Sequence, residues 1–220
     1  MAGEQITPTP RRESTPRRES TPRREPTPRP ESTPRREQIL RTAARLFAKH
    51  GFHGVSIAEL GAAVGTSGPA LYRHFPGKEA LLAEMLIRIS ERLLAGGQER
   101  AGRIDDPGEL IAALVDFQLD FTLHEPELIT VQDRDLDNLR AAERRRVRAL
   151  QRSYVEIWVD ALCRLHPGLD AEDARIAAHG AFGLLNSTPH SALRADQTRA
   201  AVRLRQMALA ALTGPQPADV

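Results

Sequence analysis

Residues 56–75 read Ser-Ile-Ala-Glu-Leu-Gly-Ala-Ala-Val-Gly-Thr-Ser-Gly-Pro-Ala-Leu-Tyr-Arg-His-Phe, and they carry the signals of two short helices joined by a turn. Ser56 followed by Glu59 has the spacing of a capping box, in which each residue satisfies a backbone N–H group of the other. Val55 against Leu60 fits the hydrophobic staple that fixes how the chain enters a helix. The sequence therefore predicts a helix that begins at residue 57.

The second half of the same stretch predicts a turn and another short helix. Gly65 suits the left-handed position that ends many helices. Thr66 or Ser67 can cap the next helix, and Pro69 is tolerated in a first turn. Two helices of about eight residues around a glycine turn predict a helix-turn-helix.

A short helix whose first side chains are small can enter the major groove of DNA, and its first-turn amides can bind phosphate oxygens. Small side chains that can offer hydroxyl groups, or apolar contacts to thymine methyl groups, occur at Thr66, Ser67, Pro69 and Ala70. We expect phosphate ligands at Tyr72, Arg73, His74 and Lys78, with Arg73 also a candidate reader of bases. For Tyr72 and His74, simple packing in the protein is an equal alternative.

The remainder of the chain has helical periodicity. Apolar residues fall on one face in three long segments, at 82–93, 110–121 and 147–165. Breaks are expected at Gly96-Gly97, Pro107-Gly108, Pro126, Pro167-Gly168, Pro189 and Gly214-Pro215. The prediction is an all-α protein of about nine helices, with a three-helix N-terminal unit and a larger helical body.

The charge is basic at the front of the chain and acidic behind it. Residues 1–36 carry a formal charge of +4, residues 37–78 carry +3, and residues 79–220 carry −5. The first segment repeats a hexapeptide close to Ser-Thr-Pro-Arg-Arg-Glu and has almost no apolar side chains, so we expect it to be disordered. It is a linker, a basic arm for DNA, or a phosphorylation target at Ser14 or Ser20.

Residues 36–84 resemble the DNA-binding domain of the TetR family of bacterial transcriptional regulators. The resemblance rests on Leu71-Tyr72-Arg73-His74-Phe75, on Lys78-Glu79-Ala80-Leu81-Leu82 and on Gly51-Phe52. It implies a homodimer that binds double-stranded operator DNA. It also implies backbone contacts from Ser56, Tyr72, His74 and Lys78. Base contacts would come from Thr66, Ser67, Gly68, Pro69 and Ala70, together with Arg73.

The expected domains are a tail at 1–34, a helix-turn-helix domain at 35–80, an effector-binding and dimerisation domain at 81–214, and a short tail at 215–220. The resemblance favours the last two long helices as the dimer interface. Small and apolar residues that suit close packing there are Ala177, Ala178, Gly180, Ala181, Gly183, Ala201, Leu204, Ala208 and Leu212. Packing within one chain is the alternative.

The resemblance also implies that the C-terminal helical part binds an effector that weakens DNA binding. A pocket with apolar walls and few polar groups favours an apolar or acylated molecule. Candidate lining residues are Met85, Ile89, Leu114, Phe117, Phe121, Leu128, Gln132, Tyr154, Trp158 and Asn186. Arginines at 140, 144, 145, 146, 148 and 152 could bind the phosphates of an acyl-CoA. A solvated helix face that balances nearby carboxylates is the favoured alternative for them.

Enzyme chemistry finds little support. The seven histidines are scattered, the single Cys163 cannot form an intramolecular disulfide, and no phosphate loop or nucleophile elbow occurs. We expect no cofactor, no metal and no membrane span, and a cytoplasmic location. The predicted function is an effector-responsive transcriptional regulator that acts as a repressor. The alternatives are an all-α ligand-binding or interaction module without DNA binding and, behind it, an enzyme.

Overall fold

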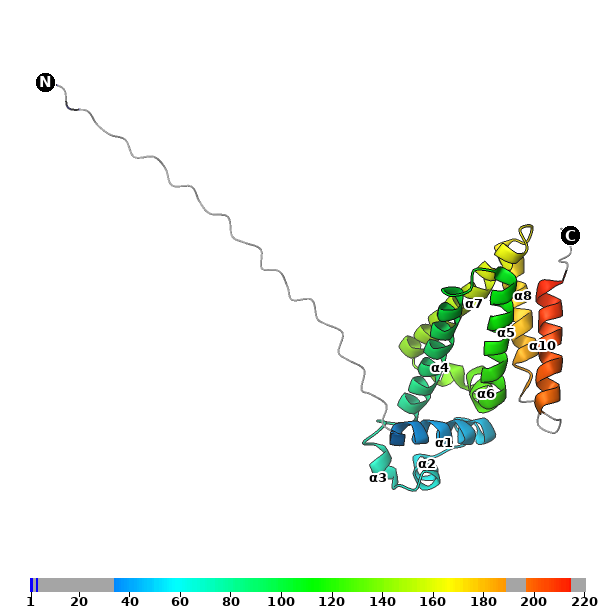
Figure 1. Ribbon diagram of the computed structural model, residues 1–220. Coiled ribbons are helices and arrows are strands. Elements are labelled where there is room, and N and C mark those ends of the chain that lie inside the picture. The colour runs from blue at the N-terminus through cyan, green and yellow to red at the C-terminus, as the bar shows by residue number, and fades with distance from the viewer. Residues whose placement is uncertain (2, 4–33, 189–196, 215–220) are drawn as a thin grey trace. The chain divides into compact units, whose positions relative to one another are not determined.

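The computed structural model describes residues 1, 3, 34–188 and 197–214 (Figure 1). Within these ranges the chain forms nine α-helices, one 3-10 helix and no strand, which confirms the all-α prediction. The helices are α1 Pro34–His50, α2 Ile57–Ala63, α3 Gly68–Leu71, α4 Lys78–Ala101, α5 Pro107–His124, α6 Pro126–Asp135, η1 Leu136–Asn138, α7 Ala141–Leu165, α8 Ala171–Leu185 and α10 Gln197–Thr213. The expectations for Ser14, Ser20, Pro189 and the two tails lie outside the described residues.

The caps predicted for α2 and α3 are present. Ser56 accepts a hydrogen bond from the Glu59 backbone while the Glu59 carboxylate accepts from the Ser56 backbone, so the capping box is complete. Gly65 adopts a φ of +69°, in the left-handed region. Ser67 caps α3 by accepting from the Ala70 amide at 3.3 Å. The predicted start and end of α2 and the predicted start of α3 are thus confirmed.

The second helix of this motif is shorter than expected. The α-helical part of α3 covers four residues, not about eight, and the chain then continues as a turn to Phe75. The amides of Arg73 and His74 bind carbonyls three residues back, at 3.3 and 2.9 Å, instead of four. Such tightening is common where a helix ends.

Two hydrophobic clusters divide the molecule. One contains the apolar faces of α1, α2 and α3, with Phe47, Leu71 and Phe75 buried at its centre. The other contains the inner faces of α5, α7, α8 and α10 and is centred on Trp158, which is fully buried. Helix α4 joins them, because its first half packs in the first cluster and its second half in the second. A division into domains near residue 80 stays a prediction.

The expected break at Gly96-Gly97 is wrong, because α4 continues through both residues to Ala101. The glycines serve close packing instead. A Cβ atom on Gly96 would lie 2.2 Å from the Phe117 ring of α5, and one on Gly97 would lie 2.8 Å from the Tyr154 ring of α7. The pair lets two neighbouring helices approach the α4 backbone.

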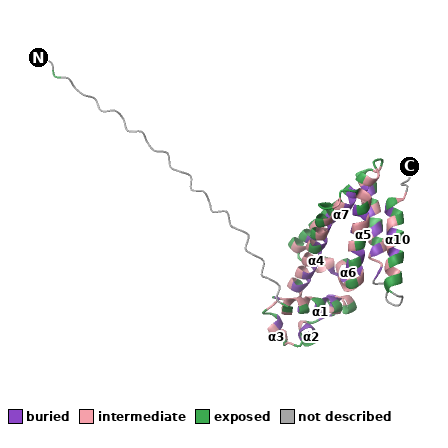
Figure 2. Cartoon of the chain, viewed as in Figure 1, coloured by how far each residue is buried: buried purple, intermediate pink, exposed green. Residues whose placement is uncertain are grey.

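Helices α8 and α10 bury more of their small-residue surface within the chain than expected. Ala178, Ala181, Ala208 and Leu212 are buried in the second cluster. Of the expected residues, Gly180 and Gly183 are exposed, and Ile176, His179, Val202 and Met207 are exposed beside them. Figure 2 shows exposed stretches along α10. Ile176, Val202 and Met207 are 64%, 50% and 54% exposed.

Replacing Gly97 with alanine tests the packing of α4 on α7. We expect Gly97→Ala to lower the free energy of unfolding by about 1–3 kcal/mol, because the new methyl group overpacks the buried Tyr154 ring. Intrinsic helix propensity alone would give the opposite sign. Gly102→Ala is the control, since a Cβ atom there lies 3.4 Å from its nearest neighbour. Urea denaturation of both variants decides, and equal stabilities would contradict the packing role.

Candidate nucleic-acid interface

The interface begins with the close contact between α2 and the turn that follows it. A Cβ atom on the buried Gly61 would lie 2.9 Å from the Thr66 carbonyl oxygen and 3.0 Å from the Gly68 nitrogen. The Thr66 amide donates to the Gly61 carbonyl at 2.8 Å. Gly61 therefore fixes the approach of α3 to α2.

The proposed base contacts form the leading edge of α3. Ser67 and Pro69 are exposed, while Thr66, Gly68 and Ala70 are partly exposed. The Ser67 hydroxyl oxygen also caps the helix by accepting from the Ala70 amide. Its O–H donor is not used in that bond. These five residues lie together at the N-terminal end of one short helix.

The proposed phosphate contacts follow at the other end of α3. Tyr72 is 52% exposed and Arg73 is exposed, whereas His74 is half-buried. Leu71 and Phe75 on either side are buried, so the segment turns its polar side chains away from the core. Ser56 lies exposed at the start of α2, although its hydroxyl already takes part in the capping box.

Lys78 makes internal contacts that the sequence did not predict. Its ammonium donates to the carbonyl oxygens of Phe52 and Val55, at 3.0 and 3.2 Å, and lies 4.5 Å from the centre of the Phe52 ring. It therefore holds the loop between α1 and α2 against the start of α4. An ammonium has three donors, so a phosphate contact would be made in addition to these bonds.

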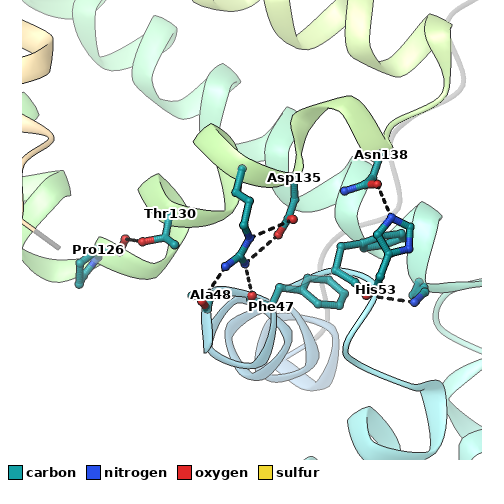
Figure 3. A network of polar contacts seen from close by, with 10 residues as sticks. Phe47, Ala48, His53, Pro126, Thr130, Asp135 and Asn138 are labelled. Carbon is teal, nitrogen blue, oxygen red and sulfur yellow. Dashed lines mark hydrogen bonds and ion pairs between the residues drawn. The ribbon is translucent and has the colours of Figure 1, made fainter. Parts of the chain in front are cut away.

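Arg134 links the helical body to the C-terminal end of α1. Figure 3 shows its partners Phe47, Ala48 and Asp135 close together. The Arg134 guanidinium donates to the Phe47 and Ala48 carbonyl oxygens, and to the buried Asp135 carboxylate at 3.0 and 3.2 Å. Carbonyl groups in the last turn of a helix lack partners within it and attract cations. Nearby, Nε2 of the His53 ring lies 2.8 Å from the side-chain oxygen of Asn138, which adds a second link.

The sequence did not single out Arg134 as a link. A basic residue in the last turn of α6 is visible in the sequence, but such a residue is expected to interact with the carbonyl groups of α6 itself. Only the tertiary fold brings Arg134 into contact with Ala48, which lies 86 residues away in the sequence.

The body contains a buried polar chain within its apolar core. The Tyr154 hydroxyl donates to the side-chain oxygen of Gln118 at 3.2 Å, and the side-chain nitrogen of Gln118 donates to the side-chain oxygen of Asn186 at 2.9 Å. Burial raises the pKa of Tyr154, so its hydroxyl stays neutral. The indole N–H of Trp158 is buried and makes no hydrogen bond within the described residues. Such a group is costly unless a partner binds it.

The candidate effector residues fall into three places. Ile89, Leu114, Phe117, Phe121, Tyr154 and Trp158 belong to the second cluster or pack against it. Met85 lies instead in the first cluster, among the buried residues of the helix-turn-helix unit. Gln132 is partly buried on α6 and is not in the polar chain, whose central amide is Gln118. A lone glutamine on the apolar face of 110–121 was the signal for Gln118.

The arginines of α7 follow the solvated-face alternative where the structure shows their partners. Arg146 pairs with Glu91 at 2.7 Å, and Arg144 and Arg148 each lie 3.5 Å from Asp137. All three pairs are at the surface. Across residues 34–188 and 197–214 no cluster of three metal-ligating side chains is found, and no helix there has the length and apolar character to cross a membrane.

The fold and this surface define a helix-turn-helix regulator with a helical body. Residues 39–85 match the family described as "Bacterial regulatory proteins, tetR family", and residues 105–190 match "Tetracyclin repressor-like, C-terminal domain". Together these matches cover more than half of the chain. The chain therefore belongs to the TetR family of bacterial transcriptional regulators.

Relatives extend the match beyond the DNA-binding unit. The chain is 30% identical over 146 residues to the HTH-type transcriptional activator FasR of Mycolicibacterium smegmatis, and the aligned part is 65% of each protein. It thus spans just under two thirds of FasR. A TetR-family regulator from Bordetella parapertussis has a TM-score of 0.71 and 27% identity, covering 79% of this chain and 93% of that one. AibR, solved in complex with isovaleryl coenzyme A and operator DNA, has a TM-score of 0.67 and 21% identity, covering 79% and 97%.

The capping box of α2 makes stability depend on pH. Hydrogen bonds from the Ser56 backbone and hydroxyl lower the pKa of Glu59. A lowered pKa in the folded state stabilises the protein above the usual Glu range and ceases to do so as pH falls through the folded pKa. We expect Glu59→Gln to cost stability at pH 7 and much less at pH 3. Glu79→Gln, in the first turn of the uncapped α4, is the control in urea titrations, and a pH-independent loss would contradict the assignment.

Removing the Arg134 guanidinium tests the link between α6 and α1. We expect Arg134→Met to lower the free energy of unfolding by about 2 kcal/mol, because it leaves the buried Asp135 carboxylate without its cation. Arg145→Met, on the exposed face of α7, should change stability by less than about 0.5 kcal/mol. Chemical denaturation of the two variants gives the comparison, and losses of equal size would argue against the link.

Proposed function

We propose that the protein is an effector-responsive transcriptional regulator that binds a palindromic operator as a homodimer. The observation that carries this proposal is the arrangement of α3, whose small residues form an exposed leading edge while Tyr72 and Arg73 project beside it and Leu71 and Phe75 anchor it in the core. Small residues suit the floor of the major groove, and hydroxyl and guanidinium groups suit the phosphates. The site residues named above are proposed in these roles.

The dimer is proposed at the outward faces of α8 and α10. One recognition helix reads only a few base pairs, so two copies about 34–36 Å apart are needed for useful specificity. Ile176, Val202 and Met207 offer exposed apolar area there, and a Cβ atom on Gly180 or Gly183 would meet nothing within 4 Å. Open space at small residues allows the backbone of a second copy to approach closely.

The effector is proposed to be a small apolar or acylated molecule bound in the body, with acyl-CoA as the leading class. The support is an apolar core with few polar groups, in which the buried Trp158 N–H makes no hydrogen bond among the described residues and lies beside the Tyr154–Gln118–Asn186 chain. A carbonyl oxygen of an acyl group could accept from that donor. The complex of AibR with isovaleryl coenzyme A adds support through the shared fold.

Repression is the proposed direction of control. Occupying a promoter is enough to block transcription, whereas activation needs an additional surface for the polymerase. FasR is named an activator, so the direction is tested in cells by the response of a reporter to deletion of the gene. The proposal also keeps the domain division at 35–80 and 81–214, with DNA binding in the cytoplasm and without an enzymatic role.

The first experiment selects bound fragments from sheared genomic DNA and then measures affinity for the selected operator by fluorescence anisotropy at several salt concentrations. We expect Arg73→Ala to weaken binding and to reduce the salt slope by about one unit, because one phosphate ion pair is lost. Tyr72→Ala should weaken binding with little change of slope, because its hydroxyl is neutral. Lys78→Ala is a poorer probe, since it also releases the loop carbonyls of Phe52 and Val55.

Gln98→Ala supplies the control for these variants. Gln98 is exposed on α4, twenty residues beyond Lys78 and so about 30 Å along the helix. Losses from Arg73→Ala and Tyr72→Ala no larger than that of Gln98→Ala would overturn the contact assignment. A wild-type protein that binds operator and random DNA equally would favour the alternative of a ligand-binding module.

A further inference from the structure

Arg36, in the first turn of α1, holds the end of the recognition helix. Its Nη1 atom donates to the carbonyl oxygen of His74, just beyond α3. His74 lies three residues beyond Leu71, in the turn that follows α3. Arg36 thus holds, from a different helix, the backbone of the turn that carries Tyr72, Arg73 and His74.

The same guanidinium is fixed by two further contacts. Its Nε and Nη2 atoms donate to the two carboxylate oxygens of Glu84 on α4, the first at 2.8 Å. Its Cζ atom lies 4.2 Å from the centre of the Phe75 ring, which is 1% exposed. Arg88 reaches the Glu84 carboxylate from the next turn at 3.6 Å. The Glu84 hydrogen bonds raise the pKa of Arg36, so the cation is permanent.

These contacts require the planar guanidinium group of an arginine. Arg36 binds two oxygens of Glu84 along one edge, a carbonyl with another nitrogen, and an aromatic ring with its face. A lysine ammonium is a point donor that cannot make this set at once. Glu84 and Arg36 are only 26% and 22% exposed, so the geometry is largely shielded from solvent.

We propose that Arg36 is a positioning residue for sequence-specific DNA binding: it sets the orientation of Tyr72, Arg73 and His74 through the His74 carbonyl and the Phe75 ring, without itself contacting DNA. This inference rests on the proposed operator binding. Arg36 follows Arg35 in the basic N-terminal sequence, but three of its nitrogens face protein groups. Arg35 donates to Gln38 on its own helix, at the surface.

The test compares Arg36→Lys, Glu84→Gln and the matched control Arg35→Lys in the full-length protein, at a temperature well below unfolding. Affinity is measured for the selected operator and for a random duplex of equal length across a salt series. We expect Arg36→Lys to weaken operator binding by about tenfold or more, the equivalent of one charge-assisted hydrogen bond. Random-duplex affinity and both salt slopes should stay within about twofold of wild type, because the charge is kept.

Glu84→Gln removes the anchor of Arg36 without changing any residue of the α3 segment. It should therefore lower operator affinity in the same direction, and the loss from Arg36→Lys should be smaller in the Glu84→Gln background than alone. Arg35→Lys should leave both affinities unchanged. The cycle separates positioning from a general loss of folding, which would reduce operator and random binding together.

Several outcomes would overturn the proposal. Operator affinity unchanged in Arg36→Lys and Glu84→Gln would show that the contacts do not orient the helix. A further variant, Arg36→Gln, removes the charge: a lower salt slope on random DNA for it, with binding by Glu84→Gln unchanged, would show that Arg36 binds phosphate directly. If the wild-type protein itself does not distinguish the operator from random DNA, the proposed function fails instead.

Discussion

Cations that bind backbone carbonyls of other segments, near a helix end, in a loop or in a turn, hold the DNA-binding unit together. Helices of four and seven residues have few internal hydrogen bonds and cannot fix their own orientation. Arg36 binds the carbonyl after α3, Lys78 binds two carbonyls of the α1–α2 loop, and Arg134 binds two at the end of α1. Each cation comes from a separate helix, so together they tie α1, α4 and α6 around the motif.

The three ties also connect the two halves of the molecule. Arg134 lies on α6, in the part of the chain that is proposed to bind an effector, and it holds the end of α1. Lys78 and Glu84 lie on α4, whose later turns pack in the second cluster with Ile89 and Leu93. A change in the body that moved either helix would act on carbonyl contacts at the helix-turn-helix, which gives the proposed effector response a physical route.

Structural features set by neighbouring residues were predictable from the sequence. The capping box, the left-handed Gly65 and the Ser67 cap all lie within three or four residues of their partners, so spacing alone predicts them. The apolar stripes of α4, α5 and α7 were likewise predicted from periodicity, and most of their members are buried. The class of protein was predictable because its motif is a continuous stretch of chain.

The features that were not predicted depend on contacts between residues that are distant in the sequence. Gly96 and Gly97 look like a helix break, and only the neighbouring Phe117 and Tyr154 rings explain why they lie within α4. Arg36 and Glu84 are 48 residues apart, and Lys78 looks like a free cation until the loop at Phe52 is placed beside it. The small residues of α8 and α10 were assigned to one interface, although Ala178, Ala181 and Ala208 are buried within the chain while Gly180 and Gly183 are exposed.

The clamp residue Arg36 is also part of the last hexapeptide of the N-terminal series, Ser32-Thr33-Pro34-Arg35-Arg36-Glu37. The gene therefore encodes the anchor of a folded domain in the same unit that it repeats upstream. Insertion or deletion of whole hexapeptides ahead of Ser32 would leave this last unit, and with it the contacts of Arg36 to Glu84 and His74, unchanged.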